Sequence, residues 1–461
     1  MEFDLIVIGS GSAGSSAIEA AHARGAKICV IERDAMGGEC PNYACVPAKA
    51  MLKSAKLYHQ TKHGLAKYGV HAGKVRFSFA EIMRRKTEVV QTITGNGKRL
   101  KKMWEGMGVK IVKGDAHFVD KHTVRVGSKQ FTAKAFVIAT GASDFVPPID
   151  GIESIDYLDY RKTTQLKRQP KFMVIIGAGP VGCEFGTFFS LLGTQVTMIQ
   201  LAPHILHRED EEVSVVIEQA MKEQGVKILT QAKALAVKKV SGGTQVTYQV
   251  KMGRRKTIKV DKVLLAAGKR ANIEGLNLKA AGVKTDAKGR LIVSESMQTS
   301  TKHIFAAGDV AGGMLFTHMA HHEGDIAGWN AMQVLQRKKG LRERDMVVVP
   351  RVTFTLPEVA SVGMTAKEAA EAKLKIEIGT FPLGALGRAV TEGERTGFVK
   401  LVVDKKTRMI LGGHAVGSSS GEILHEIALA MQMNITVDDL AAMTHAFPTW
   451  SEGVLAAASS V

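Results

Sequence analysis

The chain has 461 residues, which is too long for one ordinary core, so roughly two to four domains are expected. Apolar residues make up 45% and charged residues 23%, a globular composition, and no run of about eighteen apolar residues is present to cross a membrane. The formal net charge is +18, but no nucleic-acid-binding motif accompanies the basic clusters, so we expect no nucleic acid partner. A well-solvated surface is the simplest interpretation of this charge, and an acidic protein partner is the alternative.

The N-terminal segment carries the first dinucleotide-binding pattern. Residues 1–8, MEFDLIVI, predict a strand without the layout of a signal peptide, so we expect a cytoplasmic protein. The strand meets Gly9, Gly11 and Gly14 and is followed by a helical segment, a spacing that permits a tight turn and close approach of a pyrophosphate. The next apolar segment ends at Glu32, 23 residues after the first glycine (32 − 9), where a carboxylate can accept hydrogen bonds from a ribose.

The next feature is CPNYAC, which holds two of the four cysteines, Cys40 and Cys45. A zinc site is disfavoured because neither Cys29 nor Cys183 has a second Cys or His at ligand spacing, so these two are interpreted as core residues. A structural disulfide is uncommon in the cytoplasm, so the CPNYAC pair is interpreted as redox-active. An ideal helix would hold its two thiols too far apart for a disulfide, and the flanking prolines indicate a distorted helix start.

Residues 173–182, MVIIGAGPVG, repeat the dinucleotide pattern with Gly177, Gly179 and Gly182. The position that matches the first acidic residue is Gln200, again 23 residues after the first glycine (200 − 177). Two dinucleotide folds in one chain imply two dinucleotides, and the simplest pair is a flavin and a nicotinamide.

Three more apolar strands end at glycine turns, at VIATGA, LLAAGKRAN and HIFAAGDVAG, and ligands bind at such strand ends in α/β sheets. Asp309 in the last of them is expected to cap a helix or to bind a sugar hydroxyl. From about residue 346 the pattern changes to short strands, turns and helices, which predicts an α+β module without a nucleotide signature.

Together these motifs resemble the pyridine nucleotide–disulfide oxidoreductase family, whose members include dihydrolipoamide dehydrogenase, glutathione reductase and mercuric reductase. GGECPNYACVPAK is similar to the family pattern GGxCxNxGCxPxK, and ATG, AGKRAN and AAGDV follow in the family's order, so the resemblance covers essentially the whole chain. It implies an α/β fold with two Rossmann-like domains, which bind FAD and NADH or NADPH, and a C-terminal α+β dimerisation domain that forms a homodimer. The expected domains are 1–149 (FAD, first part), 150–272 (NAD(P)), 273–345 (FAD and central, second part) and 346–461 (interface).

The resemblance also implies roles for individual residues. Cys45 would face the flavin, and Cys40 would be the interchange thiol that meets the acceptor. Lys49, one helical turn after Cys45, would lie near the flavin and pair with Glu184. No metal ligands are implied, and the remaining cofactor-binding positions are Gly38, Ala116, Thr140, Gly141, Gly268, Arg270, Asp309, Leu315 and Thr317.

The C-terminal segment THAFPTWSEG departs from the family's HPTxxE pattern, whose histidine is the acid–base partner of the interchange thiol. Phe447 stands in the place of that histidine and cannot carry a proton, whereas Glu452 is kept. His445 would replace the missing base only if the loop were rearranged. Mercuric reductases also lack this histidine, so the chain is most similar to mercuric reductase-like members, although it ends LAAASSV without their C-terminal cysteine pair.

These observations leave three functions open. The enzyme would reduce a disulfide whose thiolate leaves without protonation, or reduce a soft metal ion such as Hg²⁺, or be a dihydrolipoamide dehydrogenase-type subunit of a larger complex. The choice of nicotinamide nucleotide is open as well, because Gln200 is neutral where family members that are specific for one nucleotide place a charge.

Overall fold

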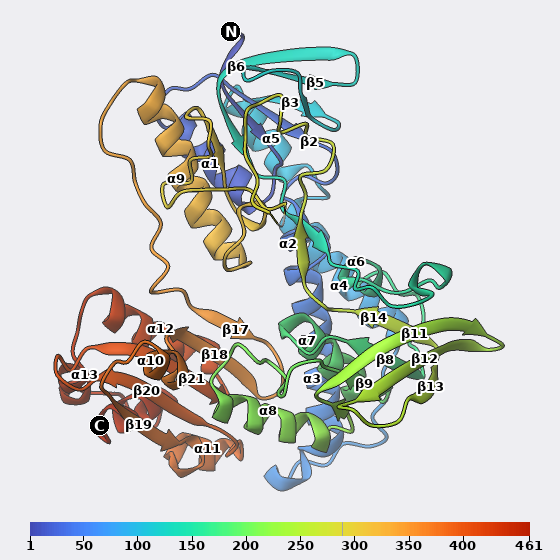
Figure 1. The fold of residues 1–461 in the computed structure, drawn as a ribbon. Helices are drawn as coiled ribbons and strands as arrows, with labels where there is room; N and C mark the ends of the chain where they lie inside the picture. The colour runs from blue at the N-terminus through green and yellow to red at the C-terminus, as the bar shows by residue number, and fades with distance from the viewer. Residues whose placement is uncertain (288) are drawn as a thin grey trace. The chain divides into compact units, whose positions relative to one another are not determined.

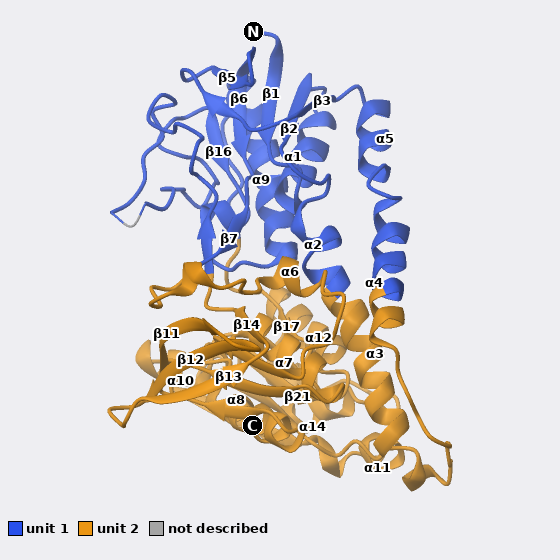
Figure 2. Ribbon diagram, turned by 90° about the vertical axis from the view of Figure 1, so that its right-hand side faces the viewer, with its two compact units in different colours: residues 1–47, 84–145, 269–344 blue, residues 48–83, 146–268, 345–461 orange. Residues whose placement is uncertain are grey.

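The computed structural model describes residues 1–287 and 289–461, which form two compact units (Figures 1 and 2). Each unit is assembled from segments that are far apart in the sequence, so neither is a simple stretch of chain. Unit 1 comprises residues 1–47, 84–145 and 269–344, and unit 2 comprises residues 48–83, 146–268 and 345–461.

Unit 1 contains a mostly parallel sheet with the strand order β3-β2-β1-β6-β5-β4, in which β16 also pairs with β6. The strands β3, β2, β1, β6 and β16 are parallel, and β4 and β5 continue the sheet in antiparallel pairing. β1 and β2 are almost entirely buried, as expected for parallel strands covered on both faces. The bounds are β1 Phe3–Ile8, β2 Ile28–Glu32, β3 Lys110–Lys113, β4 His117–Phe118, β5 Thr123–Val126, β6 Lys129–Ile138 and β16 Ile304–Ala306; β7 Ala142–Asp144 pairs separately with β15 Lys269–Ala271.

The helices of unit 1 include α1 (Ser12–His22) and α9 (Thr317–Leu335), which lie side by side in Figure 1. Their contact is unusually close because small residues face each other. A Cβ atom on Gly324 would lie 2.1 Å from the carbonyl oxygen of Ala13, and one on Gly328 would lie 2.3 Å from that of Ala17. The other helices with residues in this unit are α2 Glu39–Asn42, α3 Cys45–His63, α4 Phe79–Thr94, α5 Arg99–Gly106 and the 3₁₀ turn η3 Asp309–Ala311. Helix α3 begins in unit 1 and continues into unit 2, whereas α4 begins in unit 2 and continues into unit 1.

Unit 2 repeats the dinucleotide architecture in a parallel sheet with the order β10-β9-β8-β14. A separate antiparallel sheet, β11-β12-β13, follows in the same part of the chain. The bounds are β8 Phe172–Ile176, β9 Gln195–Ile199, β10 Lys227–Leu229, β11 Ala232–Val240, β12 Gly243–Val250, β13 Lys256–Val260, β14 Lys262–Leu265, α6 Tyr160–Thr163, α7 Pro180–Leu191, α8 Glu211–Glu223, η1 Ala66–Tyr68 and η2 Ile152–Ser154.

The C-terminal part of unit 2 is an antiparallel sheet with the order β17-β18-β21-β20-β19, covered by short helices. Its apolar core is buried between the sheet and α12 and α14. The bounds are β17 Arg351–Thr353, β18 Glu358–Gly363, β19 Ile376–Pro382, β20 Phe398–Asp404, β21 Ile410–Gly417, α10 Ala366–Glu371, α11 Gly387–Glu392, α12 Ser420–Gln432, α13 Val437–Ala442, α14 Glu452–Ala458 and η4 Leu383–Ala385.

The predicted α/β fold with two Rossmann-like sheets and a C-terminal α+β part is confirmed. The finer division at residues 149, 272 and 345 stays a prediction. In the described part of the chain, none of the helices combines the length and the apolar character that a membrane crossing needs.

The contact between α1 and α9 generates a stability prediction. We expect Gly324→Ala to lower the apparent Tm by about 2–6 °C, because the added methyl group meets a backbone carbonyl that cannot rotate away. Gly106→Ala is the control, since a Cβ atom there meets nothing within 4 Å and the residue is exposed at the end of α5. Thermal unfolding of the FAD-bound proteins at one scan rate measures both; equal Tm values for the two variants would contradict the prediction.

Candidate active site

The first glycine turn leaves one position open for a ligand. A Cβ atom on Gly9, whose φ is +103°, would lie 2.2 Å from the carbonyl oxygen of Ala139, and one on Gly14 would lie 2.1 Å from that of Gly9. The outer two glycines are therefore required by packing. At Gly11, just before α1, such a Cβ would make only a van der Waals contact with the Cα of Gly38 at 3.8 Å, so this position is less crowded than the outer two. A pyrophosphate can approach the backbone there, and the residues present fit FAD.

Glu32 ends β2 beside this turn, as the sequence pattern predicts. The side chain is buried, and its Oε2 accepts hydrogen bonds from the Ser10 N–H at 2.8 Å and the Ser10 hydroxyl at 2.6 Å. Its Oε1 accepts another from the Asp34 N–H at 2.6 Å. These donors fix the carboxylate at the end of the strand, where it can also meet a ribose hydroxyl.

The second glycine turn has the same construction. A Cβ atom on Gly177 would lie 2.2 Å from the carbonyl oxygen of Ala266, and one on Gly182 would lie 2.1 Å from that of Gly177. At Gly179, by contrast, a Cβ atom would meet nothing within 4 Å, just before α7. The open middle glycine fits the phosphates of a second dinucleotide, which is NADH or NADPH.

Gln200 occupies in the second fold the place of Glu32 in the first. Its Oε1 accepts a hydrogen bond from the Ala178 N–H at 3.1 Å, which parallels the bond between Glu32 and Ser10. Its Nε2 lies 3.4 Å from the carbonyl oxygen of His204 and 3.3 Å from Nδ1 of His207. The side chain is buried and neutral, so no formal charge stands at the end of β9 to select between the two nicotinamide nucleotides.

Cys40 lies in the short helix α2, and Cys45 is the first residue of α3; both are half-buried. The Sγ of Cys45 lies 3.4 Å from Oγ1 of Thr317, which is the first residue of α9. The N-terminal ends of α3 and α9 therefore meet at this sulfur, and helix N-termini favour negative charge. Cys29 and Cys183 are buried, and burial raises the pKa of the Cys29 thiol to about 12 and that of Cys183 further, so neither is a reactive thiolate.

Lys49 and Glu184, which the resemblance pairs, are in contact within unit 2. The Lys49 Nζ lies 2.9 Å and 2.7 Å from the two carboxylate oxygens of Glu184. Glu184 is buried, and its Oε1 also accepts a hydrogen bond from the Phe354 N–H at 3.1 Å, while the ring of Phe354 lies 4.7 Å below the Lys49 ammonium. The buried carboxylate is thus both paired and hydrogen-bonded, as such a group needs to be. The contribution of Phe354 was not predicted, because it lies 170 positions after Glu184 in the sequence.

Asp309 follows the strand β16 and begins the turn η3. Burial raises its pKa to about 6, with a smaller contribution from the carboxylate of Glu39. The turn is held from α9, where the buried carboxylate of Glu323 accepts a hydrogen bond from the Gly308 N–H at 2.8 Å and one from Arg344 at 2.8 Å. Burial also raises the pKa of Glu323, against the opposing effects of Arg344 and Gly308. Glu323 and Arg344 were not predicted, since a buried carboxylate in a helix leaves no sequence signature.

Lys269 is a further residue that sequence analysis did not single out. It lies next to Arg270 in AGKRAN and pairs with Glu39 at 3.4 Å and Asp144 at 3.2 Å, with a side chain only 18% exposed. It therefore fixes the start of α2, which carries Cys40. Arg270 itself has a 71% exposed side chain that pairs with Glu274. In the sequence, the role of Lys269 is indicated only by its position next to Arg270 at the end of a predicted strand.

The remaining predicted cofactor positions lie at strand ends and turns. The Thr140 hydroxyl donates a hydrogen bond to the carbonyl oxygen of Asn272 at 2.7 Å. Gly141 and Gly268 have positive φ and open space around them. Ala116 is buried and Leu315 is exposed. Their contacts with FAD or the nicotinamide nucleotide stay predictions.

In the C-terminal segment, Phe447 is 78% exposed in this chain. Glu452 begins α14, and its Oε2 accepts a hydrogen bond from the Thr449 N–H at 2.8 Å. Both ring nitrogens of His445 face oxygen atoms within unit 2, Nε2 at 2.6 Å from Glu426 and Nδ1 at 3.0 Å from the carbonyl of Met443. With its side chain only 3% exposed, His445 would have to break these contacts to act as a base. Its catalytic role stays a prediction.

Comparisons with known proteins identify the class. The model of the pyridine nucleotide-disulphide oxidoreductase family matches residues 3–324, and the model of its dimerisation domain matches residues 349–458. The chain belongs to this family. It is therefore a flavoprotein oxidoreductase that uses FAD and NADH or NADPH, and the dimerisation domain supports the predicted homodimer.

Individual relatives span several activities. A mercuric reductase of Staphylococcus aureus is 36% identical over 459 residues, which cover 99% of this chain and 82% of the relative. A dihydrolipoyl dehydrogenase of Thermus scotoductus is 36% identical over 462 residues, which cover 100% of this chain and 97% of the relative. The copper(II) complex of the HOCl-induced flavoprotein disulfide reductase RclA of Escherichia coli has a TM-score of 0.86 and 26% identity, with coverage of 100% of this chain and 99% of that one.

The raised pKa of Asp309 generates a pH prediction for the protein stripped of FAD. Between about pH 4 and pH 6 the folded state keeps a proton that the unfolded state has lost, so the free energy of unfolding falls as the pH rises through this window. Asp309→Asn removes the buried charge and should raise the unfolding free energy by about 1–3 kcal/mol at pH 7.5. Urea unfolding at pH 7.5 and pH 5 measures this; a gain of the same size at both pH values would contradict the assignment.

The neutral side chain of Gln200 generates a prediction about nucleotide preference. We expect kcat/KM for NADH and NADPH to differ by less than about a hundredfold, since no charge stands where specific enzymes place one. Gln200→Glu should shift the preference towards NADH, because a carboxylate repels the 2′-phosphate. Steady-state reduction of an artificial dye with each nucleotide measures both values. A thousandfold preference in the unmodified enzyme would rule this interpretation out.

Proposed function

We propose that the enzyme passes electrons from NADH or NADPH through FAD to Cys40 and Cys45, and on to a disulfide acceptor whose thiolate leaves without protonation. The observation that carries this proposal is Phe447, which stands in the place of the family's histidine base and cannot carry a proton. The contacts of His445 with Glu426 and the Met443 carbonyl support it, because they engage the imidazole that is nearest to Phe447 in the sequence.

The chemistry follows from the position of the thiols. When bound, FAD would supply the two-electron chemistry that links the nicotinamide nucleotide to the Cys40–Cys45 pair. The Cys40 thiolate then attacks one sulfur of the acceptor disulfide, whose S–S bond breaks and releases the first thiolate. The Cys45 thiolate attacks the Sγ of Cys40, which releases the second thiolate and restores the Cys40–Cys45 disulfide. The two helix N-termini at Cys45 favour its negatively charged form in this step.

Without a general acid, the leaving group of each exchange step departs as a thiolate. Thiols of low pKa leave faster in thiol–disulfide exchange, so acceptors such as aromatic disulfides are favoured over alkyl disulfides. This is the substrate class that the missing histidine supports.

A soft metal ion is the second candidate acceptor. It is favoured by the mercuric reductases, which are 36% identical over nearly the whole chain, and by the copper(II) complex of RclA. Thiolates bind soft cations directly, and no proton has to be transferred to a leaving thiolate. Turnover with Hg²⁺ or Cu²⁺, against turnover with an aromatic disulfide, distinguishes this candidate from the first.

Restoring the base tests the proposal. We expect the enzyme to oxidise dihydrolipoamide about 10²–10⁴-fold more slowly than a dedicated dehydrogenase, the usual contribution of a positioned base. Phe447→His, with Glu452 in place to orient the new imidazole, should raise dihydrolipoamide oxidation and alkyl disulfide reduction at least about tenfold. Aromatic disulfide reduction should rise by less than about threefold, because its leaving thiolate needs no proton.

The control variant is His445→Ala, which should leave all three rates within about twofold if His445 is not the base. Dye reduction, which takes electrons from FAD without the thiols, reports that each variant is loaded and active. Either a collapse of disulfide turnover in His445→Ala or an unmodified enzyme with full dihydrolipoamide activity would refute the proposal.

A further inference from the structure

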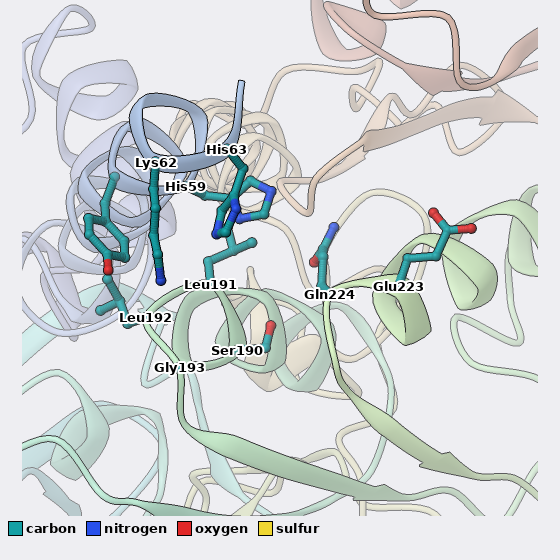
Figure 3. A pocket seen from close by; sticks show the side chains of 10 residues that line it. His59, Lys62, His63, Ser190, Leu191, Leu192, Gly193, Glu223 and Gln224 are labelled. Carbon is teal, nitrogen blue, oxygen red and sulfur yellow. The ribbon is translucent and has the colours of Figure 1, made fainter. Parts of the chain in front are cut away.

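A pocket of about 360 Å³ lies in unit 2 at the last turns of α3, the helix that begins at Cys45, and no step of the proposed reaction uses it (Figure 3). It is lined by the last turns of α3, α7 and α8. Helix α3 contributes His59, Lys62 and His63. The end of α7 and the turn after it contribute residues 190–193, and the end of α8 contributes Glu223 and Gln224.

His59 and His63 are one helical turn apart and present their imidazoles to the same pocket. Their ring centroids are 5.0 Å apart, and Figure 3 shows the two rings next to each other above Leu191. Histidines at i and i+4 on one helix face are a known chelating pair for transition metals. Burial lowers the pKa of His59, and the neighbouring His63 and Lys62 lower it further. Its neutral form, which is the form that binds a metal, is therefore favoured at neutral pH.

The electrostatics of the pocket favour a cation. The C-terminal ends of α3, α7 and α8 each carry partial negative charge, and the carboxylate of Glu223 adds to it. Gln224 donates its amide N–H to the carbonyl oxygen of Leu356, and its Oε1 is a buried acceptor without a hydrogen-bond partner among the described residues. The ammonium of Lys62 is the opposing charge, and it lies 5.6 Å from the ring centroid of Tyr58.

We propose that this pocket binds a divalent cation of the Zn²⁺, Ni²⁺ or Cu²⁺ class through the imidazoles of His59 and His63. Imidazole nitrogen selects these metals over Mg²⁺ and Ca²⁺, which prefer oxygen ligands. Within the described residues no group of three histidine, cysteine or carboxylate side chains is arranged to hold a metal. Water therefore completes the coordination, and Glu223 acts through its charge across the pocket.

Calorimetric titration of Ni²⁺ into the oxidised, tag-free, FAD-bound enzyme at pH 7.5 tests the proposal. Ni²⁺ is chosen because it favours imidazole, and the oxidised state keeps the thiols from competing. His59→Gln and His63→Gln should each weaken binding at least tenfold, and Glu223→Gln should weaken it about twofold to fivefold.

Two control variants locate the metal. His71→Gln removes an exposed histidine outside the pocket, and His318→Gln removes one from α9, so both should bind Ni²⁺ as the unmodified enzyme does. Dye reduction confirms that each variant is folded and carries FAD. Unchanged affinity in His59→Gln, or a loss in His318→Gln as large as in His59→Gln, would overturn the proposal. So would binding of inorganic phosphate that His59→Gln abolishes, because the pocket would then be an anion site.

Discussion

Both nucleotide sites depend on one constraint, the absence of a side chain at the outer glycines of each turn. At Gly9 and Gly177 the backbone passes within contact distance of a carbonyl on the neighbouring segment, so any Cβ atom would push the strand and the turn apart. At Gly14 and Gly182 the helix that follows packs directly on that turn. This close packing places the N-terminal ends of α1 and α7 at the strand ends. Glu32 and Gln200 stand at these strand ends, where the phosphates of the two dinucleotides would bind.

Local sequence patterns predicted these sites because their physical causes are local. A strand, three glycines, a helix and a residue 23 positions further on are all within one βαβ unit, and Glu32 and Gln200 occupy equivalent places. The Lys49–Glu184 contact came from a family resemblance, because the two residues are 135 positions apart in the sequence.

The contacts that escaped prediction are tertiary. Lys269 with Glu39, and Glu323 with Arg344, join segments that become neighbours only after the chain has folded. The cavity beside His59 and His63 escaped for the same reason: the histidine spacing is visible in the sequence, but the helix ends that line the pocket come from three distant segments. A single sequence records which groups can interact and not which of them meet.

The ion pair between Glu323 and Arg344 also determines the length of the unanchored segment between α9 and β17. Helix α9 ends at Leu335, yet the nine residues that follow (344 − 335) run back to the turn at Gly308, where Arg344 is held at 2.8 Å. Asn330 holds the same stretch by hydrogen bonds with the backbone of Arg342. Val348 packs on the core of the C-terminal sheet and Val349 is buried, so the unanchored segment before β17 is 345–347 and not 336–347, which shortens its maximal reach by about 30 Å at roughly 3.3–3.6 Å per residue. A buried ion pair thus limits the length of the segment that connects the nucleotide-binding and dimerisation parts of the chain.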